Sequence, residues 1–270
     1  MDWTQVERSF SRAVANSFSK KKIMLTFPVL ILCGILVVFC RAVANDASAW
    51  VSMSLAFLPI LLSSGILLAL GVLLIRIHAH EVKGLRLSFR RLISGSVDLI
   101  MGTSYLSIPT ILVYLFLWMA LGIFFLLGQI PGIGEFFSVV FAFAPFLLIF
   151  GSLLLCIVNL GLLFFVAPAA AFQPLKRTSL AKRVLGLFKG RLLSSIALFL
   201  LALVPIALVS GLLSLSAILT NVHATSDQSL AVAIEWFFIM IPFAAVLTPA
   251  VIFFFNFAAE SHQLLHPQTQ

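Results

Sequence analysis

The sequence predicts an all-α, polytopic transmembrane helical bundle of about six spans, forming one integral membrane domain over residues 1–270. Three observations support this fold class. Hydrophobic residues make up 62% of the chain and charged residues 10%, whereas soluble domains are roughly a quarter charged. The apolar residues gather in runs of 20 or more, and such runs can cross a bilayer core about 30 Å thick. The polar stretches between them are too short for a soluble catalytic domain.

The apolar runs come in three consecutive pairs, each joined by a short neutral or acidic connection at 45–49, 128–135 or 220–230. Some runs are longer than a bilayer is thick, so those helices must tilt or extend beyond it. The predicted spans are 23–44, 50–77, 97–127, 136–172, 194–219 and 231–258.

The positive charges orient these spans. Of the 17 Lys and Arg residues, all but Arg41 lie in the N-terminal segment, in 78–96 with the nearby Arg76, or in 174–191. Cytoplasmic loops retain Lys and Arg, so the pattern predicts that both termini are cytoplasmic. The net charge of +8 therefore indicates a membrane surface as the partner and not nucleic acid.

The first span has a second interpretation. Ala42-Val43-Ala44 follows an apolar run and resembles a signal-peptidase site. A transmembrane span is the preferred interpretation, because the preceding charged region is unusually long and Arg41 would crowd the cleavage site.

An internal repeat is the most informative pattern. Residues 9–14 resemble 88–93 and, more loosely, 179–184, and each copy precedes an odd-numbered span. The even-numbered spans carry a proline in their outer half, namely Pro59, Pro145 and Pro242. The chain then consists of three parallel units, each a basic amphipathic helix followed by a transmembrane hairpin, at approximately 1–77, 78–173 and 174–260. Chance similarity is the alternative, because Leu, Phe and Ala dominate the chain and the spacing of the copies varies.

The basic segments before the odd-numbered spans show helical amphipathicity. In the first of them, Trp3, Val6, Phe10, Val14 and Phe18 form one apolar stripe. Such helices lie in the headgroup region with their basic side chains near anionic lipid; the alternative is that they pack on their own bundle. The residues expected to contact anionic lipid are Lys20, Lys21, Lys22, Arg86, Arg90, Arg91, Lys182, Arg183 and Lys189.

Polar residues within the spans are few. Asn159 and Asn256 each follow a proline, Pro145 or Pro242, by 14 residues, and we expect them to form inter-helix hydrogen bonds. Pro59 is the third expected kink position. Asp98 and Glu235 are expected at helix ends, where a charged side chain has a low energetic cost. No ionisable residue lies near the middle of a predicted span, which disfavours an ion-coupled transporter.

Catalytic and metal signals are weak. His78, His80 and Glu81 form one cluster, and Glu260, His262 and His266 form another, but neither offers enough ligands for zinc. No nucleophile elbow, zinc-protease motif or phosphate-binding loop occurs. The three cysteines, Cys33, Cys40 and Cys156, lie in apolar runs and suit small apolar positions. We therefore expect no catalytic residue, metal or cofactor.

Residues 178–192, TSLAKRVLGLFKGRL, carry a family resemblance. They resemble the recurring helix before each hairpin in bacterial six-span families, such as the YciC-like membrane proteins and the membrane region of some glycerophosphodiester phosphodiesterases. The resemblance implies this architecture and a bacterial inner-membrane location. It implies no reaction, because the chain has no phosphodiesterase domain.

Two function classes follow from the sequence. The first is a non-enzymatic membrane protein that organises lipid or a membrane-protein complex, as the basic interfacial helices favour. The alternative is a transporter or permease for a lipid-like or weakly polar solute, for which the aligned prolines could open a central cavity. An intramembrane enzyme ranks third.

Overall fold

The computed structural model describes residues 3–45, 47–84, 105–132, 142–172, 192–220 and 229–265, together with positions 102, 134, 136 and 139. The described chain is helical, and six of its helices are long and apolar enough to cross a membrane. This confirms the predicted helical bundle, and it fits a multi-pass membrane protein.

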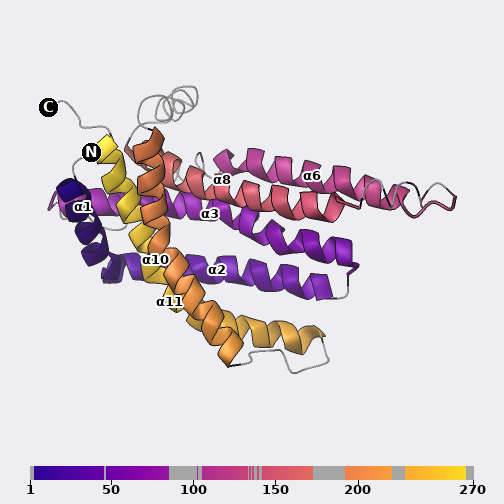
Figure 1. Cartoon of the computed structure of the whole chain (residues 1–270). Helices are drawn as coiled ribbons and strands as arrows, with labels where there is room; N and C mark the ends of the chain where they lie inside the picture. The colour runs from indigo at the N-terminus through magenta and orange to yellow at the C-terminus, as the bar shows by residue number, and fades with distance from the viewer. Residues whose placement is uncertain are drawn as a thin grey trace.

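The six long helices are joined to one short helix and two 3-10 turns (Figure 1). The short helix, α1, comes first and is followed by the turn η1. The second turn, η2, precedes α6. The bounds are α1 Trp3–Ala15, η1 Asn16–Phe18, α2 Lys20–Asn45, α3 Ala49–Val82, η2 Tyr105–Ser107, α6 Ile108–Leu127, α8 Ala144–Phe172, α10 Leu192–Leu219 and α11 Ser229–Leu265.

Consecutive long helices contact each other in pairs: α2 with α3, α6 with α8, and α10 with α11. Helix α11 also contacts α1, α2, α3 and α8, so it is the central element of the bundle. The hairpins therefore form as predicted, whereas the threefold repeat stays a prediction.

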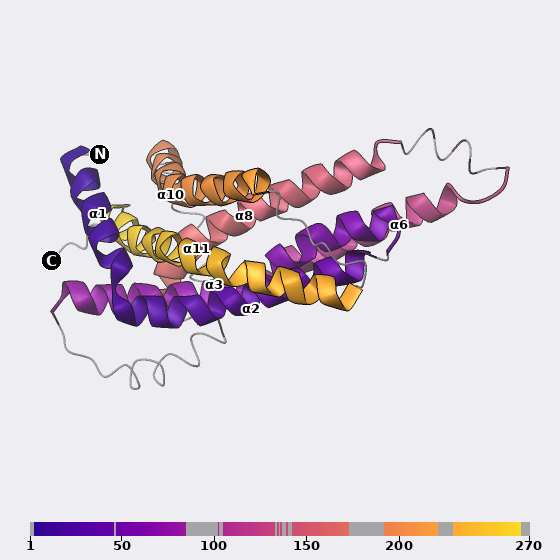
Figure 2. The same ribbon diagram turned by 90° about the horizontal axis from the view of Figure 1, so that it is seen from below.

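Helix α1 runs across the bundle and not along it (Figure 2). The turn η1 is followed by Ser19, whose φ of −63° and ψ of 122° are extended and not helical. This residue separates α1 from α2 and lets the chain change direction. The last turns of α11 contact α1 here, and the start of α2 and the last turn of α3 bond to this same part of α11. We call this the α1 end of the bundle.

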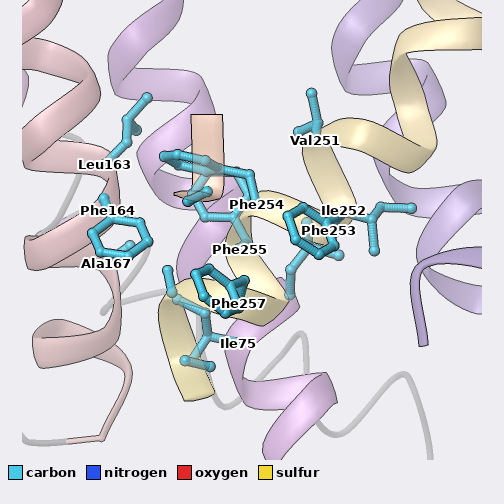
Figure 3. Close-up of a cluster of buried hydrophobic side chains, with 14 of the residues drawn as sticks. Ile75, Leu163, Phe164, Ala167, Val251, Ile252, Phe253, Phe254, Phe255 and Phe257 are labelled. Carbon is cyan, nitrogen blue, oxygen red and sulfur yellow. The ribbon is translucent and has the colours of Figure 1, made fainter. Parts of the chain in front are cut away.

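The main apolar core lies among α3, α8, α10 and α11 (Figure 3). Phe164 of α8 and Phe254 of α11 are buried there, with ring centroids 5.7 Å apart. Gly71 lets α3 approach α11 closely, because a Cβ at this position would collide with the ring of Phe255. A smaller core near the other end of the bundle contains Trp50, Leu121, Ala144 and Leu148.

Several helix limits differ from the predicted spans. Helices α3 and α11 continue to Val82 and Leu265, beyond the predicted ends at 77 and 258. These extra turns are polar, and a helix can continue outside the apolar region that hydropathy detects. Helix α6 begins at Ile108, and residues 97–101 of the predicted span lie outside the described residues.

The three prolines predicted at similar positions in the even-numbered spans do not occupy similar positions in the observed helices. Pro59 and Pro242 lie inside α3 and α11, but Pro145 is the second residue of α8. Proline lacks an N–H and is tolerated in a first turn, where that donor would have no helical partner. Pro145 therefore does not interrupt α8, and its role as a kink position in the longer predicted span stays a prediction.

Candidate functional site

Six polar side chains from four helices meet at the α1 end of the bundle. Two come from α3 and two from α11, in each case at a spacing of three or four residues that places them on one helical face. The remaining two come from α1 and the first turn of α2. We call this set the polar network, and its members are Arg12, Lys22, His78, Glu81, Asn256 and Glu260.

Lys22 is at the centre of the polar network and is fully buried. Its Nζ lies 2.8 Å from Oε2 of Glu81, 3.1 Å from Oδ1 of Asn256 and 3.4 Å from Nδ1 of His78. The carbonyl oxygen of Asn16 lies slightly farther away, at 3.5 Å. A protonated lysine has three hydrogens to donate. The three nearest acceptors can therefore use all of them.

The position of Lys22 assigns the tautomer of His78. Because the ammonium donates toward Nδ1, we assign Nδ1 as the acceptor and Nε2 as the nitrogen that carries the hydrogen. Nε2 lies 2.9 Å from Oε1 of Glu260, to which it donates. The other carboxylate oxygen of Glu260, Oε2, accepts from Nη1 of Arg12 at 3.3 Å. A neutral imidazole thus links Lys22 to Glu260.

The charges of the polar network balance. Lys22 and Arg12 supply two positive charges, and Glu81 and Glu260 supply two negative charges. Buried ions are tolerated when each is paired and hydrogen-bonded. The side chains of Arg12 and Glu81 are 49% and 31% exposed, while those between them are buried. The network therefore crosses the bundle interior and reaches the surface at both ends.

The same residues fasten α1 to the bundle. Nδ2 of Asn256 donates to the carbonyl oxygen of Ala13 at 3.4 Å, so this amide connects α11 with both α1 and α2. Beside it, the ring of Phe10 packs edge-on against those of Phe253 and Phe257, with centroids 5.0 and 5.8 Å away. An apolar contact and an ionic contact therefore hold the same short helix.

Comparison of the chain with protein-family models, curated proteins and solved structures finds no match. The resemblance to bacterial six-span families stays a prediction, and the site is interpreted from its own geometry. The three N–H groups of the Lys22 ammonium all have acceptors within the protein. This arrangement suits the fastening of helices.

The structure distinguishes among the residues expected to contact lipid. Lys20 and Lys21 are exposed, but Lys22 is buried and bonded within the protein. The expectation that Lys22 contacts anionic lipid is wrong, because its ammonium is enclosed by α2, α3 and α11. The other residues of that prediction lie outside the described residues, namely Arg86, Arg90, Arg91, Lys182, Arg183 and Lys189.

The two His and Glu clusters lie far apart in the sequence. The fold joins His78 and Glu81 of the first to Glu260 of the second, with Lys22 between them. His80 does not join them; its Nδ1 lies 2.7 Å from the carbonyl oxygen of Arg76. Within the described ranges, no group of three or more His, Cys, Asp or Glu residues is placed to hold a metal ion. His266 and Asp98 lie outside those ranges.

Asn159 lies away from the polar network, in the middle of α8, and is buried. It forms part of the lining of a small cavity together with Ser64 and Ser107. This second polar position is smaller and carries no charge.

Proposed function

We propose that the chain is a non-enzymatic membrane protein of the bacterial inner membrane that binds and organises anionic lipid through the α1 end of its bundle. In this proposal the α1 end and both termini face the cytoplasm. The observation that carries it is the surface formed by α1, η1 and the first turns of α2. Both apolar and basic side chains are exposed on these elements, namely Trp3, Arg8, Phe18, Lys20, Lys21 and Met24.

This combination suits the boundary between headgroups and acyl chains. Tryptophan is enriched at that boundary, and exposed basic side chains are attracted to anionic headgroups. Helix α1 runs across the bundle (Figure 2) and is fastened there by the polar network. If the long helices span the membrane, α1 therefore lies roughly parallel to the membrane plane. The predicted amphipathic stripe is divided: Val6 and Phe10 pack inward, while Trp3 and Phe18 remain available for lipid.

The alternative, transport of a lipid-like or weakly polar solute, would require a larger internal space. Two cavities among the described residues, one beside Asn159 and one beside Phe164, are each about 10 Å³, and a space of that size holds about one water molecule. The dense aromatic core around Phe164 and Phe254 also supports an organising role (Figure 3).

Native mass spectrometry of the protein released from nanodiscs of mixed anionic and zwitterionic lipid tests the proposal. We expect Lys20→Gln and Lys21→Gln each to weaken retention of anionic lipid about fivefold, from a contribution of about 1 kcal/mol per basic residue near the surface. Arg41→Gln is the matched control. It removes the same charge at the other end of α2, where Arg41 lies 4.0 Å from the ring of Trp236.

Equal anionic-lipid retention by the Lys20, Lys21 and Arg41 variants would contradict the proposal, and so would solute flux in proteoliposomes. Orientation is tested separately by fusing a fluorescent protein or alkaline phosphatase after residue 270. We expect fluorescence and no phosphatase activity, because the C-terminus is proposed to be cytoplasmic.

A further inference from the structure

Asn159 presents an unpaired hydrogen-bond donor inside the bundle. Its side chain is 5% exposed, and its Nδ2 finds no hydrogen-bond acceptor among the residues that the structure describes. Buried amides in native proteins are nearly always paired, with protein or with an ordered water molecule. A donor left in this state therefore indicates a partner other than the described side chains and backbone.

A cavity adjoins this amide. It is about 10 Å³ in the space open to the centre of a water molecule, and it lies between α3, η2 and α8. Its polar lining comes from Ser64, Ser107 and Asn159, and the remainder is leucine. The volume is near the minimum for a single water molecule.

The donors and acceptors around the cavity match one water molecule. The hydroxyl of Ser64 donates its hydrogen to the carbonyl oxygen of Leu61 at 2.6 Å, which leaves its oxygen able to accept. Ser107 contributes a second hydroxyl. Water can accept a hydrogen from Nδ2 of Asn159 and donate to these hydroxyl oxygens, and a buried water typically makes about three such bonds.

We propose that one ordered water molecule occupies this cavity and bridges Asn159 to Ser64 and Ser107. The water joins α3 and α8 to the turn that precedes α6. The site takes a single neutral hydrogen-bonding molecule of this size. It does not depend on the lipid-binding function proposed above.

The test is NMR of the full chain in nanodiscs with ¹⁵N-labelled asparagine. We expect a dipolar cross-peak between a long-lived water and the side-chain amide of Asn159. Its backbone signal is assigned by combining ¹³C′-valine with ¹⁵N-asparagine, because Val158-Asn159 is the one Val-Asn pair in the sequence. This assignment needs no variant and is linked to the side chain within the residue.

Ser64→Ala removes one acceptor, and we expect the water cross-peak to be lost. Ser63→Ala is the matched control: Ser63 is the neighbouring residue, it is also buried, and it does not line this cavity. The cross-peak should survive that change. A wild-type Asn159 amide without a water cross-peak would overturn the proposal, as would equal loss in the two serine variants.

Discussion

The buried ammonium of Lys22 offers the most direct test of the polar network. Lys22→Met keeps a side chain of similar length but removes all three N–H groups. Asn256 Oδ1 and His78 Nδ1 then lose a donor, and both residues are almost fully buried. Glu81 loses less, because its side chain is 31% exposed and can be hydrated.

Two buried acceptors without a partner cost about 1 to 3 kcal/mol each. Part of this loss is offset, since methionine does not carry the desolvation cost of a buried charge. We therefore expect Lys22→Met to lower the free energy of unfolding by about 2 to 4 kcal/mol. Glu81→Gln should also destabilise, because it leaves the Lys22 ammonium buried without a carboxylate.

The double variant distinguishes an interacting pair from two independent residues. Lys22→Met with Glu81→Gln should lose at least about 1 kcal/mol less than the two single losses combined, since each change removes a group that the other leaves unpaired. Reversible unfolding in mixed micelles, followed by circular dichroism, gives these free energies. The control is Lys20→Met, an exposed change expected to stay within about 0.5 kcal/mol. Equal effects of the Lys22 and Lys20 variants, or additivity within about 0.5 kcal/mol, would refute the reasoning.

Two further predictions use the same unfolding assay. Gly71→Ala should lower the free energy of unfolding by about 1 to 3 kcal/mol through overpacking, because its methyl group would meet the ring of Phe255. The control is Gly161→Ala, where a Cβ has no neighbour within 4 Å; it should leave that free energy unchanged or raise it. A smaller effect at Gly71 than at Gly161 would be evidence against close packing of α3 on α11. Tyr114→Phe should cost about 0.5 to 1.5 kcal/mol, because the buried hydroxyl donates to the carbonyl oxygen of Ser54. Its control is the exposed Tyr105→Phe, and similar costs at both positions would remove the role assigned to that bond.

The six helices could be predicted from the sequence because apolar runs of sufficient length have few other stable environments than a bilayer. Their ends could not. Hydropathy falls at His78 and after Ala258, yet α3 and α11 continue as helix to Val82 and Leu265. Those additional turns carry Glu81 and Glu260, so the part of the fold that hydropathy cannot locate is the part that forms the polar network.

The polar network was also difficult to predict because it depends on how α2 is rotated about its axis. Residues 20–22 are three consecutive lysines, and tertiary contacts decide which of them points inward. One signal was present: Lys22, Thr26, Leu30 and Cys33 are spaced as one helical face, and all four are buried. Extending that apolar face backward by one turn identifies Lys22 as the inward lysine. The pairing of His78 with Glu260 carries no comparable signal, because 182 residues separate them.

The polar network and the proposed lipid surface both use the segment formed by α1, η1 and the start of α2, and their roles can be separated. A helix as short as α1 has little stability in isolation, so its placement depends on Phe10, Arg12 and the network around Lys22. Loss of Lys22 should therefore disturb both the fold and the lipid-binding surface. Loss of the neighbouring Lys20 should affect lipid retention while leaving the fold intact. Within the first turn of α2, the burial of Lys22 and the exposure of Lys20 and Lys21 assign these two roles to neighbouring residues.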